Sequence, residues 1–167
     1  MILLISYGNG LRRDDGAGHV LAATLERRWR AEHVPCRHVA VRQLLPELAA
    51  DIARPGVTAL VFVDASDASR GEGPDRVLVR AVTLPAATAP SLGHQLGPAT
   101  LMAYAGLLSP ESRGVPAWLV TVPGVDFGHG QGLSVPARRS MDTALAERDG
   151  GLHRLLAAGH ETRARGN

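Results

Sequence analysis

A glycine-rich turn near the amino terminus carries two adjacent carboxylates. The turn covers residues 6–18, and Asp14 and Asp15 lie within it, between Gly10 and Gly16. Free backbone N–H groups at the start of a helix commonly bind anions. Two carboxylates at that position would instead repel a phosphate and favour a cation, a metal-bound group or a cationic substrate. The alternative is that both acids only cap the following helix, which would stabilise it by about 0.3–2 kcal/mol.

Two further residues have side chains suited to the same chemistry. Asp64 follows the apolar run 59–63, and because an unpaired carboxylate inside a strand is costly, we expect it at the carboxyl end of that strand. Alternatively, Asp64 could only cap the next segment or precede a turn at residues 66–69. His94 precedes an apolar stretch, and the positive end of a helix disfavours an imidazolium, so a neutral ring able to bind a metal is expected there. A histidine hydrogen-bonded within a loop is the alternative.

These side chains need a scaffold that brings separate stretches of chain to one edge. The run 1–5 is short, branched and apolar, as in a buried parallel strand, and residues 15–31 carry apolar side chains at helical spacing. Further strands are expected at 34–41, 59–63, 76–82 and 116–122, and further helices near Pro46, over 98–108 and from Pro136 to 156. The stretch 76–82 alternates with period two, which suits an antiparallel strand. The first and third strands would end at the edge where open α/β sheets hold their ligand crevice.

Composition limits the number of domains and the classes of function. The chain has 167 residues, 45% of them hydrophobic, so we expect one domain over residues 1–158 and a disordered tail over 159–167. The net charge is only +2 and 4% of residues are aromatic, which gives nucleic-acid binding little support. The sequence shows neither a signal peptide nor a stretch apolar enough to span a membrane, which predicts a cytoplasmic protein with no membrane partner.

Cys36 is the single cysteine of the chain. It therefore cannot form an internal disulfide or a cysteine-based zinc site. Its expected place is a buried strand position. A catalytic thiol would need His38 as its partner, and the two would lie on the same face of a strand.

Three motifs that follow one another along the chain resemble those of the hydrogenase maturation proteases. These are the endopeptidases that trim the carboxyl terminus of the large subunit of nickel–iron hydrogenases. The motifs cover residues 8–18, 61–65 and 91–96, and the resemblance extends to 132–134 before the last helix. It implies a single-domain, three-layer α/β/α sandwich with a mostly parallel twisted sheet of about five strands, one of them antiparallel. It also implies that Asp15, Asp64 and His94 converge on a metal.

The resemblance further implies a substrate and a chemistry. The metal would be nickel already installed in the hydrogenase large-subunit precursor, so no permanent cofactor is required, and zinc or another divalent ion could bind to the isolated protein. Two carboxylates and an imidazole suit nickel or zinc. The resemblance implies an aspartyl-type endopeptidase in which Asp15 and Asp64 are the catalytic residues, and either could act as the general base for a water. The candidate substrate-binding residues are Asn9, Gln43 and Gly132.

Departures from the family pattern leave alternatives open. Residues 41–47 lack the glycine–threonine turn of the best-known members, so the substrate is in question and the chain resembles an outlying subgroup. His19, four residues after Asp15 on the same helix face, is a rival for His94. A non-proteolytic module that binds a metal-bearing partner is a second candidate function. A nucleotide-binding domain built on residues 8–18 is a third, although no lysine is present there to reach a phosphate.

Overall fold

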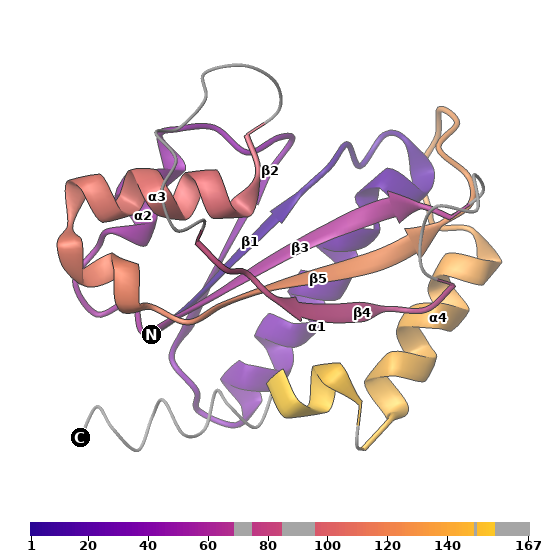
Figure 1. The fold of residues 1–167 in the computed structure, drawn as a ribbon. Coiled ribbons are helices and arrows are strands. Elements are labelled where there is room, and N and C mark those ends of the chain that lie inside the picture. Colours follow the sequence, from indigo (N-terminus) through magenta and orange to yellow (C-terminus); the bar gives the residue numbers. More distant parts are fainter. Residues whose placement is uncertain (69–74, 85–95, 149, 156–167) are drawn as a thin grey trace.

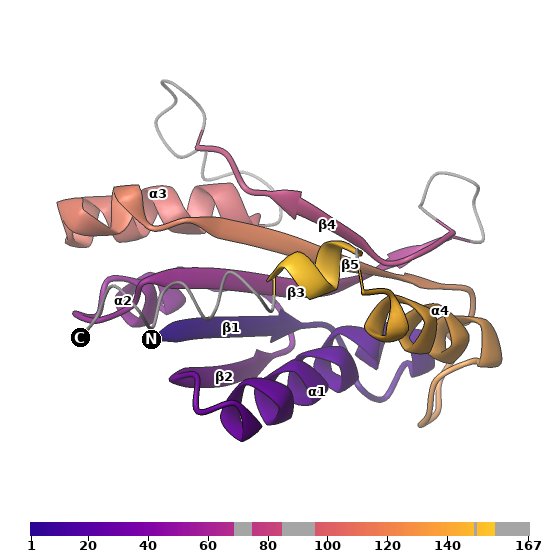
Figure 2. The ribbon, with the colours of Figure 1, turned by 90° about the horizontal axis from the view of Figure 1, so that it is seen from below.

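A five-stranded sheet forms the centre of the protein (Figure 1). The structure, a computed structural model, describes residues 1–68, 75–84, 96–148 and 150–155. The strands are β1 (Ile2–Tyr7), β2 (Cys36–Val41), β3 (Ala59–Asp67), β4 (Leu78–Ala81) and β5 (Ala117–Gly124). Their order is β2-β1-β3-β5-β4, and Figure 2 shows them side by side. β4 pairs antiparallel with β5, whereas the other three pairings are parallel.

Helices cover both faces of this sheet. They are α1 (Ala17–Ala31), α2 (Leu48–Ile52), α3 (Pro98–Leu108) and α4 (Val135–Ala146), with 3-10 turns η1 (Arg13–Gly16) and η2 (Pro110–Gly114). In Figure 1, α2 and α3 lie on one side of the strands and α1 and α4 on the other. The three-layer arrangement expected from the sequence is therefore confirmed.

The alternation of side chains along β1 divides the core into two layers. Leu4 packs into the cluster that contains the buried side chains of α1 and Met141 of α4. Ile5 packs into the cluster formed with α2 and α3. Because successive side chains of a strand point to opposite faces, Ser6 faces α1 and Tyr7 faces the side of α2 and α3. This division decides which polar side chains can meet at the end of β1.

The predicted elements are present, with ends that differ by a few residues. The stretch 98–108 is helical over its full predicted length as α3, and β4 confirms the antiparallel strand within 76–82. The helix expected near Pro46 begins only at Leu48. The closing helix ends at Ala146, ahead of the two glycines, and the chain is helical again over residues 151–155.

β3 is longer than the sequence predicts, because it continues past Asp64 to Asp67. β5 supplies pairing partners as far as Asp67↔Gly124, whereas pairing with β1 stops at Ser6↔Val63. The hydrogen bonding of β5 thus extends a strand whose apolar run has already ended. Asp64 lies within β3, one residue beyond Val63, the last residue of β3 that pairs with β1.

Cys36 is the first residue of β2 and is partly buried rather than fully buried. Burial, with the nearby charge of Glu26, raises the pKa of the Cys36 thiol. A raised pKa disfavours the thiolate that a nucleophilic cysteine needs. The alternative of a catalytic thiol therefore loses support.

The remaining expectations on the chain as a whole concern its tail and membranes. The tail expected at 159–167 lies outside the described residues. Among the helices that the structure describes, none is long and apolar enough to cross a membrane.

Candidate functional site

A cavity opens at the carboxyl ends of β1 and β3, the edge of the sheet that the sequence predicts. Its volume is about 520 Å³, and it is lined by Tyr7, Gly8, Asp15, Arg42, Gln43, Leu44, Asp64, Ala65 and Leu96. A neighbouring hollow of similar volume shares Arg42 and Gln43 and reaches Asn9. The structure therefore brings together four of the residues predicted from the sequence, namely Asp15, Asp64, Gln43 and Asn9.

Asp64 reaches the cavity because the pairing of β3 with β1 ends one residue before it, at Val63. It is two residues beyond Phe62, so its side chain lies on the same face of the sheet, that of α2 and α3. The hydroxyl of Tyr7 donates a hydrogen bond to the Asp64 carboxylate. The backbone N–H of Ala65 donates a second one to Oδ1, at 2.8 Å. The sequence analysis did not identify Tyr7 as a residue of this cavity. Because successive side chains of β1 point to opposite faces, its orientation toward α2 and α3 could have been predicted.

Asp15 is brought to the cavity by η1 and the start of α1. α1 can approach β3 closely because Gly18 has no side chain, and a Cβ there would lie only 2.8 Å from the carbonyl oxygen of Val63. The backbone N–H of Asn9 donates a hydrogen bond to Asp15 Oδ2 at 2.9 Å. Gly8 precedes it with a φ of +134°, and a Cβ at Gly8 would collide with the backbone oxygen of Asp15. The glycines of the motif thus hold the turn tightly around Asp15.

The Asp64 carboxylate is affected by burial and by the charge of Asp15. Burial raises the pKa of Asp64 to about 6, the charge of Asp15 adds to this rise, and the hydrogen bonds from Ala65 and Tyr7 oppose it. Burial and the charge of Asp64 in turn raise the pKa of Tyr7, which keeps its hydroxyl protonated as a donor. A cation bound beside Asp64 and Asp15 would favour the ionised form of Asp64. The donor set on this wall of the cavity is therefore chemically suited to a divalent metal ion.

Asp14 does not line this cavity, although it is adjacent to Asp15 in the same turn. Its side chain is 0% exposed and accepts hydrogen bonds of 2.7–3.0 Å from the N–H groups of Val125 and Asp126 and from the N–H and hydroxyl of Ser134. Burial alone would raise the pKa of Asp14, but these hydrogen bonds lower it. Asp14 thus fastens the glycine-rich loop after β5. Capping of α1 does not account for the described hydrogen bonds of either acid.

His94 and Gly132 are not placed with this group. His94 lies outside the described residues, so its part in the site stays a prediction. Gly132 belongs to the loop that Asp14 fastens, has a φ of +89°, and is not among the residues lining the cavity. Within the described ranges, no three His, Cys, Asp or Glu side chains gather closely enough to hold a metal ion.

His19, the rival ligand, is engaged elsewhere. Its Nδ1 lies 2.7 Å from Ser6 Oγ, and its Nε2 lies 3.0 Å from the carbonyl oxygen of Gly8. Because protein atoms occupy both ring nitrogens, His19 does not act as a metal ligand in this arrangement.

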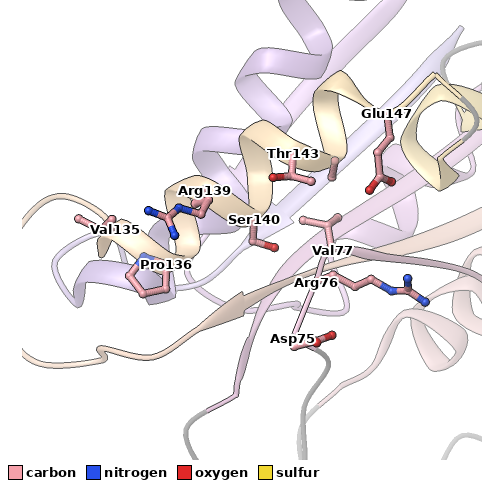
Figure 3. A pocket seen from close by; sticks show the side chains of 10 residues that line it. Asp75, Arg76, Val77, Val135, Pro136, Arg139, Ser140, Thr143 and Glu147 are labelled. Carbon is pink, nitrogen blue, oxygen red and sulfur yellow. The ribbon is translucent and has the colours of Figure 1, made fainter.

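A further hollow of about 350 Å³ lies between α4 and the chain that leads into β4 (Figure 3). Ser140 and Thr143 of α4 face Val77 across it. Its charged lining residues are of both signs, Asp75, Arg76, Arg139 and Glu147. Of the predicted site residues that the structure describes, none lines this hollow, so the cavity with Asp15 and Asp64 remains the candidate site.

Solved structures with a similar fold include several hydrogenase maturation proteases. The [NiFe] hydrogenase maturation protease HybD from Thermococcus kodakarensis has a TM-score of 0.60 and 18% identity, covering 85% of this chain and 92% of its own. The hydrogenase maturating endopeptidase HybD from E. coli has a TM-score of 0.57 and 20% identity, covering 96% and 93%. An endopeptidase from Escherichia coli, solved in solution, has a TM-score of 0.61 and 21% identity, with the same coverage.

These likenesses concern the fold. No protein-family model and no curated protein matches the chain. The solved structures nevertheless confirm the resemblance at the level of the three-dimensional fold, over most of the length of each protein.

Proposed function

We propose that this protein is an endopeptidase that removes the carboxyl-terminal extension of a nickel-loaded hydrogenase large-subunit precursor. The observation that carries the proposal is the pair Asp15 and Asp64, which come from two separate motifs and line one cavity. The similarity of the fold to hydrogenase maturation proteases supports it. Two carboxylates in one cavity supply oxygen ligands for a metal ion that a substrate carries.

Nickel belongs to the substrate in this proposal. The carboxylates of Asp15 and Asp64 would bind the ion from one side, and His94 would add an imidazole. The charge of Asp15 disfavours ionisation of Asp64, and a bound cation would remove that penalty. The protein would accordingly bind the loaded precursor more tightly than the unloaded one.

In this proposal Asp64 acts as the general base. Its pKa is about 6 without a metal, and a cation bound beside it would favour the ionised form, which is the form that accepts a proton. In the proposed reaction, Asp64 accepts a proton from a water whose oxygen bonds to the scissile carbonyl carbon. The carbon–nitrogen bond then breaks, and the proton passes to the leaving amine. The metal would orient the precursor and polarise the carbonyl.

The neighbouring hollow offers a path for the precursor chain. It shares Arg42 and Gln43 with the cavity and continues to Asn9. Arg42, which the sequence reasoning did not single out, would add a cation that binds carbonyl or carboxylate oxygens of the precursor. We propose Asn9 and Gln43 as substrate contacts on this path. Gly132, on the loop fastened by Asp14, remains a proposed contact outside the cavity.

The proposal is tested by incubating the protein with a nickel-loaded precursor and measuring the precursor's mass. We expect one shortened product, and no product from the metal-free precursor. A known maturation protease serves as the positive control. If the control shortens the precursor and this protein does not, the proposal is wrong.

A non-proteolytic binding module is the second candidate function. The altered segment 41–47 favours it, because Arg42 and Gln43 from this segment line both hollows. Co-elution of the uncut precursor with the protein on size exclusion would support binding without cleavage. Loss of cleavage in Asp64→Asn with binding retained would instead support the protease.

A further inference from the structure

A chain of hydrogen-bonded polar groups, one buried and the others partly buried, crosses three elements on the face of the sheet opposite the cavity. Ser6 of β1 is 0% exposed, and its Oγ lies 2.7 Å from His19 Nδ1 of α1 and 2.7 Å from His38 Nε2 of β2. His19 Nε2 lies 3.0 Å from the carbonyl oxygen of Gly8. At the far end, His38 Nδ1 is 3.8 Å from a carboxylate oxygen of Glu26. The proposed reaction uses none of these side chains.

The partners fix the direction of the hydrogen bonds. A carbonyl oxygen can only accept, so His19 Nε2 carries the hydrogen that it donates to Gly8. The Nδ1 of a neutral His19 then accepts from the Ser6 hydroxyl, and the Ser6 oxygen in turn accepts from His38 Nε2. Each donor therefore points toward the end of β1. Hydrogen bonds aligned in one direction polarise and strengthen one another.

This series of hydrogen bonds ends at the peptide group between Gly8 and Asn9, and Gly8 also lines the cavity. The Gly8 carbonyl and the Asn9 N–H belong to the same planar peptide group, in which they point in opposite directions. His19 binds the carbonyl at 3.0 Å, and the N–H donates to Asp15 Oδ2 at 2.9 Å. Rotation of this group would break both hydrogen bonds together. The backbone N–H of Gly8 is held as well, by the carbonyl of Arg42 at 3.2 Å.

We propose that His19 is a positioning residue for Asp15, acting through the peptide group between Gly8 and Asn9, with Ser6 and His38 holding the imidazole in the required tautomer. This inference rests on the proposed function for its consequence in catalysis, but the positioning itself is a property of the protein alone. Ser6 is not a nucleophile in this arrangement, because its side chain is fully buried. Burial also lowers the pKa of His38, although Glu26 opposes this change.

Two substitutions of His19 separate positioning from packing. In His19→Gln, the side-chain amide can occupy the place of Nε2 and donate to the Gly8 carbonyl, whereas His19→Leu fills space without a donor. The measurement is amide hydrogen exchange of Asn9 by NMR on the full-length, 15N-labelled protein. Exchange at Val61, in the buried part of β3, reports on global stability in the same spectra.

We expect the Asn9 amide to exchange about three to ten times faster in His19→Leu, after correction for any change at Val61, because one hydrogen bond of ordinary strength is lost. In His19→Gln, exchange should stay close to that of the wild type. The 15N spectrum of the wild-type imidazole should show His19 protonated on Nε2. Unchanged Asn9 exchange in His19→Leu, or an equal loss in both variants, would overturn the proposal.

Ser6→Ala provides a second variant if His19→Leu does not fold. It removes only the hydroxyl that holds the His19 ring, so the Nε2–H tautomer should lose population and Asn9 exchange should rise. An unchanged tautomer with unchanged exchange would refute the role given to Ser6. If the wild type cleaves a precursor, His19→Leu should lower kcat and His19→Gln should restore it. If the wild type does not cleave, the exchange data still test the positioning role.

Discussion

Replacement of Asp64 by asparagine should make the protein more stable than the wild type at neutral pH. The folded protein holds the proton of Asp64 up to a pKa of about 6, whereas an unfolded chain releases it near 3.8. Between these values the native state binds more protons than the unfolded state, so this group lowers the free energy of unfolding as pH rises. The amide introduced by Asp64→Asn would carry no charge, and it would keep an oxygen that accepts from the Ala65 N–H and the Tyr7 hydroxyl.

The size of this effect follows from the two pKa values. The difference between 3.8 and about 6 corresponds to about 3 kcal/mol, at ~1.36 kcal/mol for each pKa unit. Asp64 is not fully buried, and partial solvation reduces the penalty, so we expect an advantage of about 1–3 kcal/mol for Asp64→Asn at pH 8. The advantage should vanish near pH 4 and level off above pH 6.

The assay is urea denaturation of the wild type and Asp64→Asn at intervals from pH 4 to pH 8, at constant ionic strength. Asp142→Asn is the matched control, because Asp142 is exposed on α4 and its substitution changes the net charge by the same amount. If the advantage of Asp64→Asn is flat with pH, or shrinks as pH rises, the electrostatic account of the cavity is refuted.

Two further predictions concern the surroundings of the site. Asp14→Asn should destabilise the protein by about 2–4 kcal/mol, because the hydrogen bonds from Val125, Asp126 and Ser134 then meet a neutral group. The hydrogen bonds lower the pKa of Asp14 in the folded protein. The stability that Asp14 contributes is therefore present at neutral pH and is lost as pH falls below about 4. A urea midpoint of Asp14→Asn equal to that of the wild type at pH 7 would contradict this prediction. Gly18→Ala should cost about 1–3 kcal/mol, because the new methyl group would press on the backbone of β3. A thermal midpoint equal to that of the wild type would show that α1 can move away.

The fold could be predicted from the sequence because its signals are local. The run 59–63 is apolar and branched throughout, and the apolar stretch 98–108 has the length of the helix it forms. The extension of β3 to Asp67 could not be predicted in this way. It depends on pairing with β5, whose residues lie 57 positions further along the chain than their partners in β3.

The candidate site was predictable in outline. Strand ends of a parallel sheet meet at one edge, which is enough to place Asp15 and Asp64 together. The different orientation of Asp14 was not predictable, because its hydrogen-bond partner Ser134 is 120 residues away in the chain, whereas Asp15 bonds to Asn9 within the same turn. The hydrogen bonds that link His38, Ser6 and His19 could not be predicted either, because they depend on the register of β1 against β2.

The most direct test of the proposed protease is single-turnover cleavage of the nickel-loaded precursor by the wild type, Asp64→Asn and Asp142→Asn. The account predicts that the wild type and Asp142→Asn release the extension at equal rates, whereas Asp64→Asn binds the precursor but cleaves it at least about a hundredfold more slowly, as expected for loss of a general base. Cleavage by Asp64→Asn at the wild-type rate would contradict the account.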